Sequence, residues 1–178
     1  MKLRVDDISA EERRLNFAEP ESEMNHALSV GPLQEYRILR PVEVRIAHYR
    51  AGTEVFLHGS VRAELVAACA RCAEEFTTHR GRGFRYVLAP AALDDHQDDK
   101  DEIEYTVYQG DEIDLTPMVR EQMLLALAER PLCREDCRGL CARCGVNLNE
   151  HACGCRTEAG DPRLAVLRSL SVKRPVAH

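Results

Sequence analysis

Eight cysteines are arranged in four close pairs along this chain of 178 residues. Six of them fall between Cys133 and Cys155, and the other two form a Cys-x-x-Cys pair far upstream. The pairs are Cys69 and Cys72, Cys133 and Cys137, Cys141 and Cys144, and Cys153 and Cys155. Closely spaced thiolates are typical ligands of a tetrahedral metal ion, because one turn of the chain can supply two sulfur atoms. The chemistry that we expect is therefore thiolate metal ligation.

The spacing favours two sites with four cysteines each, and thus two zinc ions. Cys141-x-x-Cys144 is followed by Gly145, and a glycine at that point lets the backbone approach the sulfur atoms closely. The first site would use Cys141, Cys144, Cys153 and Cys155. The second would use Cys69, Cys72, Cys133 and Cys137, and would close a long loop between the two halves of the chain. The spacing leaves open a different site made of Cys133, Cys137, Cys141 and Cys144.

Other interpretations of the cysteines are weaker. His151 lies between the last two pairs and could replace one cysteine as a ligand. Iron also accepts four sulfur ligands, so sulfur alone does not exclude it. Cys69 and Cys72 could be one buried and one exposed thiol, or a redox pair. A thioredoxin-like redox pair belongs at a strand-to-helix junction of a βαβ unit, which this sequence does not predict.

The rest of the composition indicates a chain that remains in the cytoplasm. We find no run of about 18 apolar residues that would predict a membrane span. The N-terminus becomes acidic at Asp6 and Asp7, too early for a signal peptide. In the reducing cytoplasm disulfides are rare, so thiolates are expected. The net charge of −6 argues against nonspecific coating of nucleic acid. Residues 34–88 nevertheless hold nine basic and six acidic residues, whereas residues 91–114 hold ten acidic residues and one lysine.

These patterns predict the elements that would hold the cysteines. Residues 42–48 and 55–67 alternate as strands of a hairpin, with Val55, Leu57 and Val61 in the apolar phase. After Cys72 the chain should return in two strand pieces, 75–78 and 83–88, with bends at Gly81 and Gly83. Residues 103–107 read as a further strand. Thr116 and Pro117 predict the start of an amphipathic helix that ends near Pro131.

We therefore expect an α+β fold in which a bent, mostly antiparallel β-sheet packs on one main helix, with a C-terminal cysteine-rich zinc-binding tail. The predicted organisation has three parts. Residues 1–33 form an N-terminal strand and an irregular arm, with a loop or helical turn near Glu11–Arg14. Residues 34–130 form the core domain, with an acidic loop at 90–101. Residues 131–178 form the zinc-binding tail and a short C-terminal helix that starts near Asp161.

Several segments resemble a known family in sequence, order and spacing. They are Cys69-Ala70-Arg71-Cys72-Ala73-Glu74-Glu75-Phe76, Ile113-Asp114-Leu115-Thr116, Pro131-Leu132-Cys133, Asp136-Cys137-Arg138-Gly139-Leu140-Cys141, Cys144-Gly145-Val146-Asn147-Leu148-Asn149 and Asp161-Pro162-Arg163-Leu164. Over about residues 40–170 the chain resembles the bacterial YceD family of large ribosomal RNA subunit accumulation proteins. The resemblance implies a cytoplasmic, non-enzymatic factor in the synthesis, processing or accumulation of large-subunit rRNA. It provides no catalytic residues to carry over.

The residues themselves are compatible with RNA binding and give no sign of an enzyme. Candidate phosphate-binding arginines lie near both groups of cysteines, and they are Arg71, Arg80, Arg82, Arg85, Arg134, Arg138 and Arg143. Arginines beside thiolates could equally offset the negative charge of a metal site. The chain has no Trp, which disfavours a base-stacking platform. All-cysteine zinc sites are usually closed and structural, so we expect no catalysis.

Three functions remain open. The first is a factor with structural zinc that binds large-subunit rRNA or a pre-ribosomal particle. The second is a zinc-stabilised adaptor that binds only a ribosomal protein or assembly factor. The third is a redox- or metal-responsive regulator. None of them predicts a membrane partner or a small-molecule substrate.

Overall fold

The computed structural model describes residues 1–30, 35–91 and 104–155. Most of the acidic loop at 90–101, the helix expected after Asp161 and the rest of the C-terminal segment lie outside the described residues. The elements in chain order are β1 (Lys2–Arg4), η1 (Val5–Asp7), β2 (Arg13–Glu19), α1 (Glu21–Val30), β3 (Tyr36–Ile38), β4 (Val42–Ala51), β5 (Glu54–Ala68), β6 (Glu75–Pro90), β7 (Glu104–Tyr108), β8 (Glu112–Asp114) and α2 (Thr116–Leu125). The fold is α+β, as predicted.

The main sheet has six strands in the order β2-β4-β5-β6-β7, and β3 also pairs with β5. All of these pairs are antiparallel except β6 with β7, which is parallel. The predicted hairpin is confirmed, because β4 and β5 pair from Glu43 with Arg62 to Ala51 with Glu54. A small second sheet joins β1 near the N-terminus to β8.

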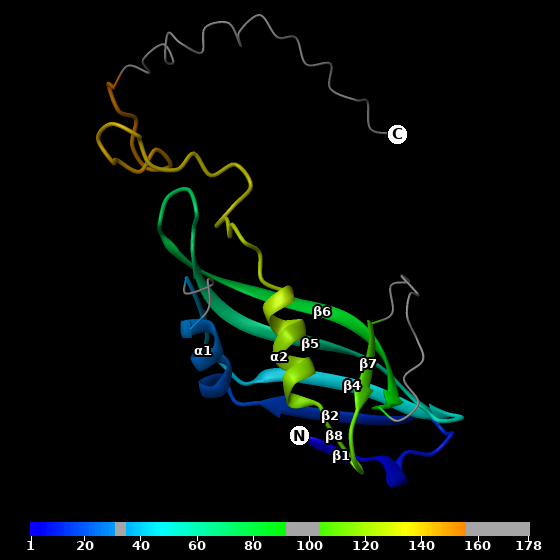
Figure 1. The fold of residues 1–178 in the computed structure, drawn as a ribbon. Coiled ribbons are helices and arrows are strands. Elements are labelled where there is room, and N and C mark those ends of the chain that lie inside the picture. The colour runs from blue at the N-terminus through cyan, green and yellow to red at the C-terminus, as the bar shows by residue number, and fades with distance from the viewer. Residues whose placement is uncertain (31–34, 92–103, 156–178) are drawn as a thin grey trace, which may run out of the picture.

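The hydrophobic core lies between one face of the main sheet and the two helices. Along β5 the buried residues alternate with more exposed ones from Val55 to Ala67, in the phase that the sequence predicted. Val119 and Met123 of α2 and Met24 and Leu28 of α1 belong to the same buried cluster. Figure 1 shows both helices on the same side of the curved strands. Among the described residues, no helix covers the other face of the sheet.

Three local predictions need correction. Residues 21–30, expected to be irregular, form α1, because Met24 and Leu28 are four residues apart and both bury against the sheet. The sheet thus packs on two helices of ten residues each, not on one main helix. The expected loop near Arg13 and Arg14 is the start of strand β2, which pairs with β4.

A fourth correction concerns β6, which runs without interruption from Glu75 to Pro90, so Gly81 and Gly83 do not divide it. Helix α2 starts at Thr116, as predicted, but ends at Leu125, before Pro131. At its start, the Oδ1 atom of Asp114 accepts the Thr116 amide at 3.0 Å. A carboxylate at a helix N-terminus is favourable because unpaired amides point toward it.

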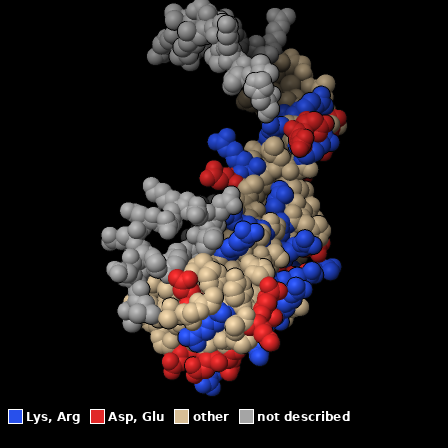
Figure 2. Space-filling view, turned by 90° about the vertical axis from the view of Figure 1, so that its right-hand side faces the viewer, with Lys and Arg blue, Asp and Glu red and all other residues tan. Residues whose placement is uncertain are grey.

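None of the helices in the described part of the chain has the length and apolar character needed to cross a membrane. Acidic side chains gather near the bottom of the view in Figure 2, at the end that carries β1 and β8, whereas basic side chains are spread over the whole face. The cysteine-rich segment leaves α2 and extends past the tip of the β5–β6 hairpin (Figure 1).

Candidate metal centre

The first group of four sulfur atoms lies at the tip of the β5–β6 hairpin, and we call it the sheet cluster. It is formed by Cys69, Cys72, Cys133 and Cys137, whose Sγ atoms all lie within 4.8 Å of one another. Cys69 and Cys72 come from the turn between the two strands, and Cys133 and Cys137 follow α2. Cys69, Cys72 and Cys137 are buried. Two segments of backbone that are far apart in the sequence therefore meet around one compact group of thiols.

The second group, the tail cluster, lies further along the cysteine-rich segment. It is formed by Cys141, Cys144, Cys153 and Cys155, and its four Sγ atoms also lie within 4.8 Å of one another. Cys144 and Cys155 are exposed to solvent. The sulfur atoms thus form the two groups that the sequence spacing favoured, and both groups could hold a metal ion.

The sulfur distances of the sheet cluster fit a tetrahedral ion. A Zn–S bond of about 2.3 Å places two sulfur ligands of a tetrahedron about 3.8 Å apart. The Sγ atoms of Cys69 and Cys137 are 3.8 Å apart, and those of Cys72 and Cys133 are also 3.8 Å apart. Among the described residues, His151 belongs to neither cluster, so each group consists of cysteines alone.

Both Cys-x-x-Cys turns have the same backbone design. The amide of Ala73 donates to the Cys69 carbonyl at 2.8 Å, and the amide of Gly145 donates to the Cys141 carbonyl at 2.9 Å. The residue after the second cysteine has a positive φ in each turn, 60° at Ala73 and 74° at Gly145. Glycine adopts a positive φ readily, which suits Gly145. The sequence gave no sign of this conformation at Ala73, because alanine rarely adopts a positive φ.

Arg71 ties the cysteine-rich segment to the sheet. Its guanidinium donates to the carbonyl oxygens of Glu135 at 3.1 Å and Cys137 at 2.8 Å. Its own carbonyl accepts the amide of Leu140 at 3.0 Å, and the neighbouring Ala70 amide donates to the Pro131 carbonyl at 2.8 Å. Arg71 therefore acts within the fold, by satisfying backbone groups of the segment that carries two cysteines of the sheet cluster.

Asn149 connects the two clusters, and the sequence analysis did not single it out as a site residue. Its Nδ2 atom donates to Sγ of Cys137, a member of the sheet cluster, at 3.4 Å. Its Oδ1 atom accepts the Arg138 amide at 2.8 Å and the Arg134 guanidinium at 2.9 Å. Hydrogen bonds to ligand atoms orient a metal site and tune its affinity. The residue that does this for the sheet cluster thus comes from the loop of the tail cluster.

The thiols of each cluster differ in acidity. Burial raises the pKa of the Cys69 thiol, but the amides of Cys133, Cys72 and Arg71 outweigh it and lower this pKa to about 6. Burial and the hydrogen bond with Cys69 raise the pKa of Cys133 to about 12. In the tail cluster, the amides of Cys144 and Arg143 lower the pKa of Cys141 to about 6. A divalent cation would replace the remaining protons and neutralise the charge of the thiolates.

The seven candidate RNA-binding arginines do not form one surface. Arg71, Arg134 and Arg138 hold the cysteine-rich segment through the hydrogen bonds described above, and Arg143 lies in the turn of the tail cluster. Arg80, Arg82 and Arg85 lie on β6, away from the tail cluster. The Arg82 Nε atom donates to Oε1 of the buried Gln122 at 3.0 Å, which links β6 to α2.

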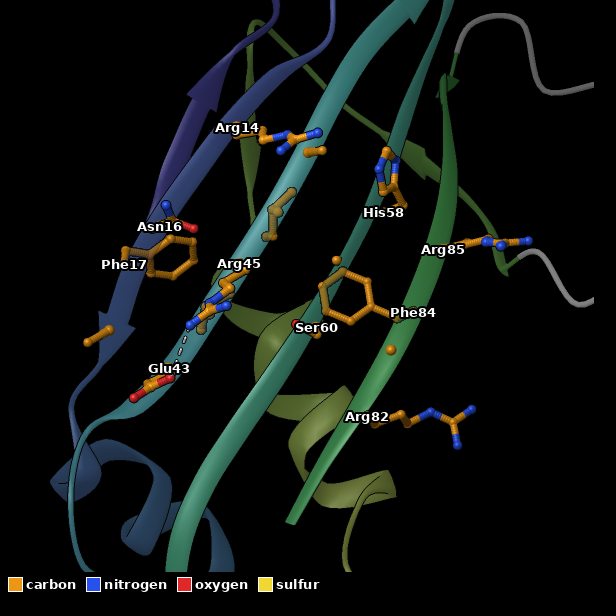
Figure 3. A pocket seen from close by; sticks show the side chains of 16 residues that line it. Arg14, Asn16, Phe17, Glu43, Arg45, His58, Ser60, Arg82, Phe84 and Arg85 are labelled. Carbon is orange, nitrogen blue, oxygen red and sulfur yellow. Dashed lines mark ion pairs between the residues drawn. The ribbon is translucent and has the colours of Figure 1, made fainter. Parts of the chain in front are cut away.

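A broad hollow crosses strands β2, β4, β5 and β6, and we call it the sheet trough. Its volume is about 1630 Å³, and its lining includes Arg14, Arg45, His58, Arg82 and Arg85. Figure 3 shows these side chains on the strands, with α2 behind the sheet. The sequence did not single out Arg14, Arg45 or the trough, because nothing in the sequence shows that their strands are neighbours.

Comparison with known proteins agrees with the resemblance that the sequence suggested. The model of one family, described as large ribosomal RNA subunit accumulation protein YceD, matches residues 57–171. The chain is 25% identical over 163 residues to the chloroplastic "Large ribosomal RNA subunit accumulation protein YCED homolog 1" of Arabidopsis thaliana, covering 78% of this chain and 51% of the relative. It is 35% identical over 136 residues to an uncharacterized protein of Mycobacterium tuberculosis, covering 72% of this chain and 60% of the relative.

The chain therefore spans between half and two thirds of these relatives. No solved structure gives a significant match. The family model covers well over half of the chain and includes both Cys-x-x-Cys turns and the segment between them. On this evidence the chain belongs to the YceD family of large ribosomal RNA subunit accumulation proteins.

Proposed function

We propose that this protein is a non-enzymatic factor in the synthesis, processing or accumulation of large-subunit rRNA, and that two structural zinc ions stabilise it. The observation that carries the proposal is the pair of all-cysteine clusters in a chain of this family. A zinc ion with four thiolate ligands has no open position for substrate or water, so it serves structure and not catalysis. The protein acts in the cytoplasm, where thiols remain reduced.

Zinc in the sheet cluster would fasten the cysteine-rich segment to the β5–β6 hairpin. That contact closes a loop of more than 60 residues between Cys72 and Cys133, and the entropy cost of closing such a loop in the absence of metal is high. Metal binding energy offsets this cost, because the ligands are brought together only in the folded chain. The direct partner is large-subunit rRNA or a precursor particle.

Metal analysis tests the structural part of this proposal. The purified chain should contain two zinc ions by native mass spectrometry. Cys72→Ser and Cys155→Ser, which each remove one ligand from a different cluster, should contain one. Iron in place of zinc, or full metal content in both variants, would contradict the assignment.

Crosslinking in growing cells tests the RNA part. The tagged protein is irradiated with ultraviolet light and purified under denaturing conditions, and the attached RNA is sequenced. Enrichment of a large-subunit precursor region over an untagged strain supports direct contact. If a ribosomal protein or assembly factor remains associated after RNase treatment and no RNA is crosslinked, the protein is an adaptor and direct contact is refuted.

A further inference from the structure

We infer that the sheet trough binds the phosphate backbone of RNA. This inference rests on the proposed function, and it locates the RNA contact on the face of the sheet opposite α1 and α2 instead of on the cysteine-rich segment. The inference is based on three observations: the register that aligns arginines across the strands, the positive charge of the trough lining, and the open floor of the trough.

The register of four strands aligns charged residues from distant parts of the sequence. Arg14 on β2 pairs with Ala47, Ala47 pairs with His58, and His58 pairs with Arg85 on β6, so these residues form one row across the sheet. Strands are spaced about 4.8 Å apart, so this row spans roughly 14 Å. Arg45 belongs to the next row on the same face, beside Ser60. Positive charges therefore extend in two directions over the surface, as an extended polyanion requires.

The charge of the lining is strongly one-sided for a protein with a net charge of −6. A second, smaller hollow adjoins the trough on β5 and β6 and shares several of its residues. Together the two are lined by one acidic residue, Glu43, and on the same face of the sheet by four arginines, Arg14, Arg45, Arg62 and Arg85. Arg80 and Arg82 also border the hollows, but they pair with the buried Ala63 and Val61, so their side chains belong to the face that carries α2. Arginine guanidinium groups donate forked hydrogen bonds that match the oxygens of a phosphate.

The ion pairs between these arginines and their acidic neighbours are weak. Arg45 lies 3.9 Å from Glu43, a pair that Figure 3 marks, and Arg14 lies 3.3 Å from Glu12. The arginine side chains in these pairs are 72% and 81% exposed, and such exposed pairs contribute about 0–1 kcal/mol. Phosphate groups that bridge several arginines can therefore displace the carboxylates without a large cost.

The floor of the trough is open because small residues occupy it. Ser60 and Gly83 face each other across β5 and β6, and a Cβ atom built on Gly83 would meet only the Gly59 carbonyl oxygen, at 3.7 Å. That distance is ordinary van der Waals contact, so the space above Gly83 is left to a ligand. We infer contact with the backbone and not with stacked bases, because both aromatic residues labelled in Figure 3 pack on the core. Phe84 is buried in it, and the partly buried Phe17 packs against it.

Charge removal in the trough is the principal test. The triple variant Arg14→Gln, Arg45→Gln and Arg85→Gln is compared with wild type for binding of a fluorescent RNA hairpin of about 16 base pairs, by anisotropy at several salt concentrations. Three lost phosphate contacts should lower the slope of log K against log salt by about 2–3 and weaken binding at least tenfold at moderate salt. The matched control is Lys2→Gln, Arg4→Gln and Arg130→Gln, which removes the same charge from exposed positions outside the trough. It should change binding less than threefold.

Gly83→Glu provides a second test that removes no existing side chain. Its added carboxylate should reduce RNA binding at least fivefold while the thermal unfolding midpoint and zinc content stay at the wild-type values. If the triple variant and Gly83→Glu bind RNA as tightly as wild type, while Arg134→Gln and Arg143→Gln lose RNA binding, the trough is not the RNA site. Direct contact with RNA would then still hold. If wild type fails to bind the hairpin and crosslinks no RNA in cells, the proposed function itself fails. Capture of an acidic protein by the trough in place of RNA would refute the inference as well.

Discussion

Gly139 makes the sharpest prediction about the cysteine-rich segment. Its φ is +74°, and a Cβ atom at this position would lie 2.8 Å from the carbonyl oxygen of Arg71. That carbonyl is the one that accepts the Leu140 amide at 3.0 Å, in the contact that fastens the segment to the hairpin tip. Gly139→Ala should therefore weaken metal binding in the sheet cluster without changing any ligand.

The expected magnitude follows from two contributions. A left-handed conformation costs an alanine about 1–2 kcal/mol. Displacing the Leu140 hydrogen bond costs about 1 kcal/mol more. Since the strain disappears when the segment detaches, the sum of about 2–3 kcal/mol should appear as a roughly 30- to 150-fold loss in metal affinity.

Two other glycines of the same segment serve as graded controls. Gly145 has the same φ of +74° but nothing within 4 Å of an added Cβ, so Gly145→Ala carries only the conformational cost of about 1–2 kcal/mol. Gly154 has neither a positive φ nor a close neighbour, and Gly154→Ala should behave as wild type.

The assay is competition for cobalt between the protein and a chelator, followed by the thiolate-to-cobalt absorption, with zinc content measured in parallel. The expected order of affinity is wild type and Gly154→Ala, then Gly145→Ala, then Gly139→Ala. Equal affinities in Gly139→Ala and Gly154→Ala would refute the contact with Arg71 as the fastening point.

Two further predictions concern the sheet. Arg120 on α2 donates to Oε1 of Glu19, which is 6% exposed, at 2.9 Å, and this hydrogen bond raises the Arg120 pKa. Arg120→Ala should lower the free energy of unfolding in urea by about 2–3 kcal/mol, because it leaves a buried carboxylate unpaired. The exposed Arg40, paired with Glu64, should give no measurable change on replacement by alanine, and equal losses would contradict this account. Burial, and then the nearby Arg13, lower the pKa of His48. The pKa of His48 is lower in the folded protein than its unfolded value of about 6.5. As pH falls below 6.5, the unfolded chain binds a proton at His48 more readily than the folded chain does. The contribution of His48 to the free energy of unfolding is therefore present above pH 6.5 and lost below it. Between pH 7.5 and pH 5.5 the free energy of unfolding should therefore fall more for wild type than for His48→Leu. The difference in slope should be at most about 1.4 kcal/mol per pH unit.

Local spacing favoured the observed grouping of the cysteines but left one alternative open. A Cys-x-x-Cys turn brings two sulfur atoms together by itself, and Cys153 and Cys155 lie within 14 residues of Cys141 and Cys144. The alternative site made of Cys133, Cys137, Cys141 and Cys144 is excluded only by the structure, which places Cys133 and Cys137 with Cys69 and Cys72. The strong alternation from Val55 to Ala67 likewise gave the correct buried face of β5. Helix α1 was not predicted, because the turn signal of Gly31 and Pro32 outweighed the single apolar pair within it.

The sheet trough could not be predicted, because it depends on tertiary pairing. Arg14 and Arg85 are 71 positions apart and share a surface only through the register of two intervening strands. The basic residues that the sequence did point out lie next to the cysteines in the chain. Arg71 and Arg134 prove to hold backbone and side-chain groups of their own fold. Closeness to the cysteines in the sequence thus led to RNA-binding candidates whose side chains bond within the fold. The arginines that face the open surface of the trough lie elsewhere in the sequence.

The metal clusters and the trough are physically separable parts of the molecule. Cys69, Cys72 and Cys137 form a buried group distinct from the main core, and Phe76 packs against both. The sheet buries its own apolar residues against α1 and α2, so its strands do not depend on a metal ion to keep their register. If zinc occupies the two clusters, as we propose, its binding orders residues 131–155, whereas the arrangement of Arg14, Arg45 and Arg85 follows from the sheet alone. On that proposal, removal of zinc should alter how the cysteine-rich segment is presented beside the trough and leave the trough itself intact.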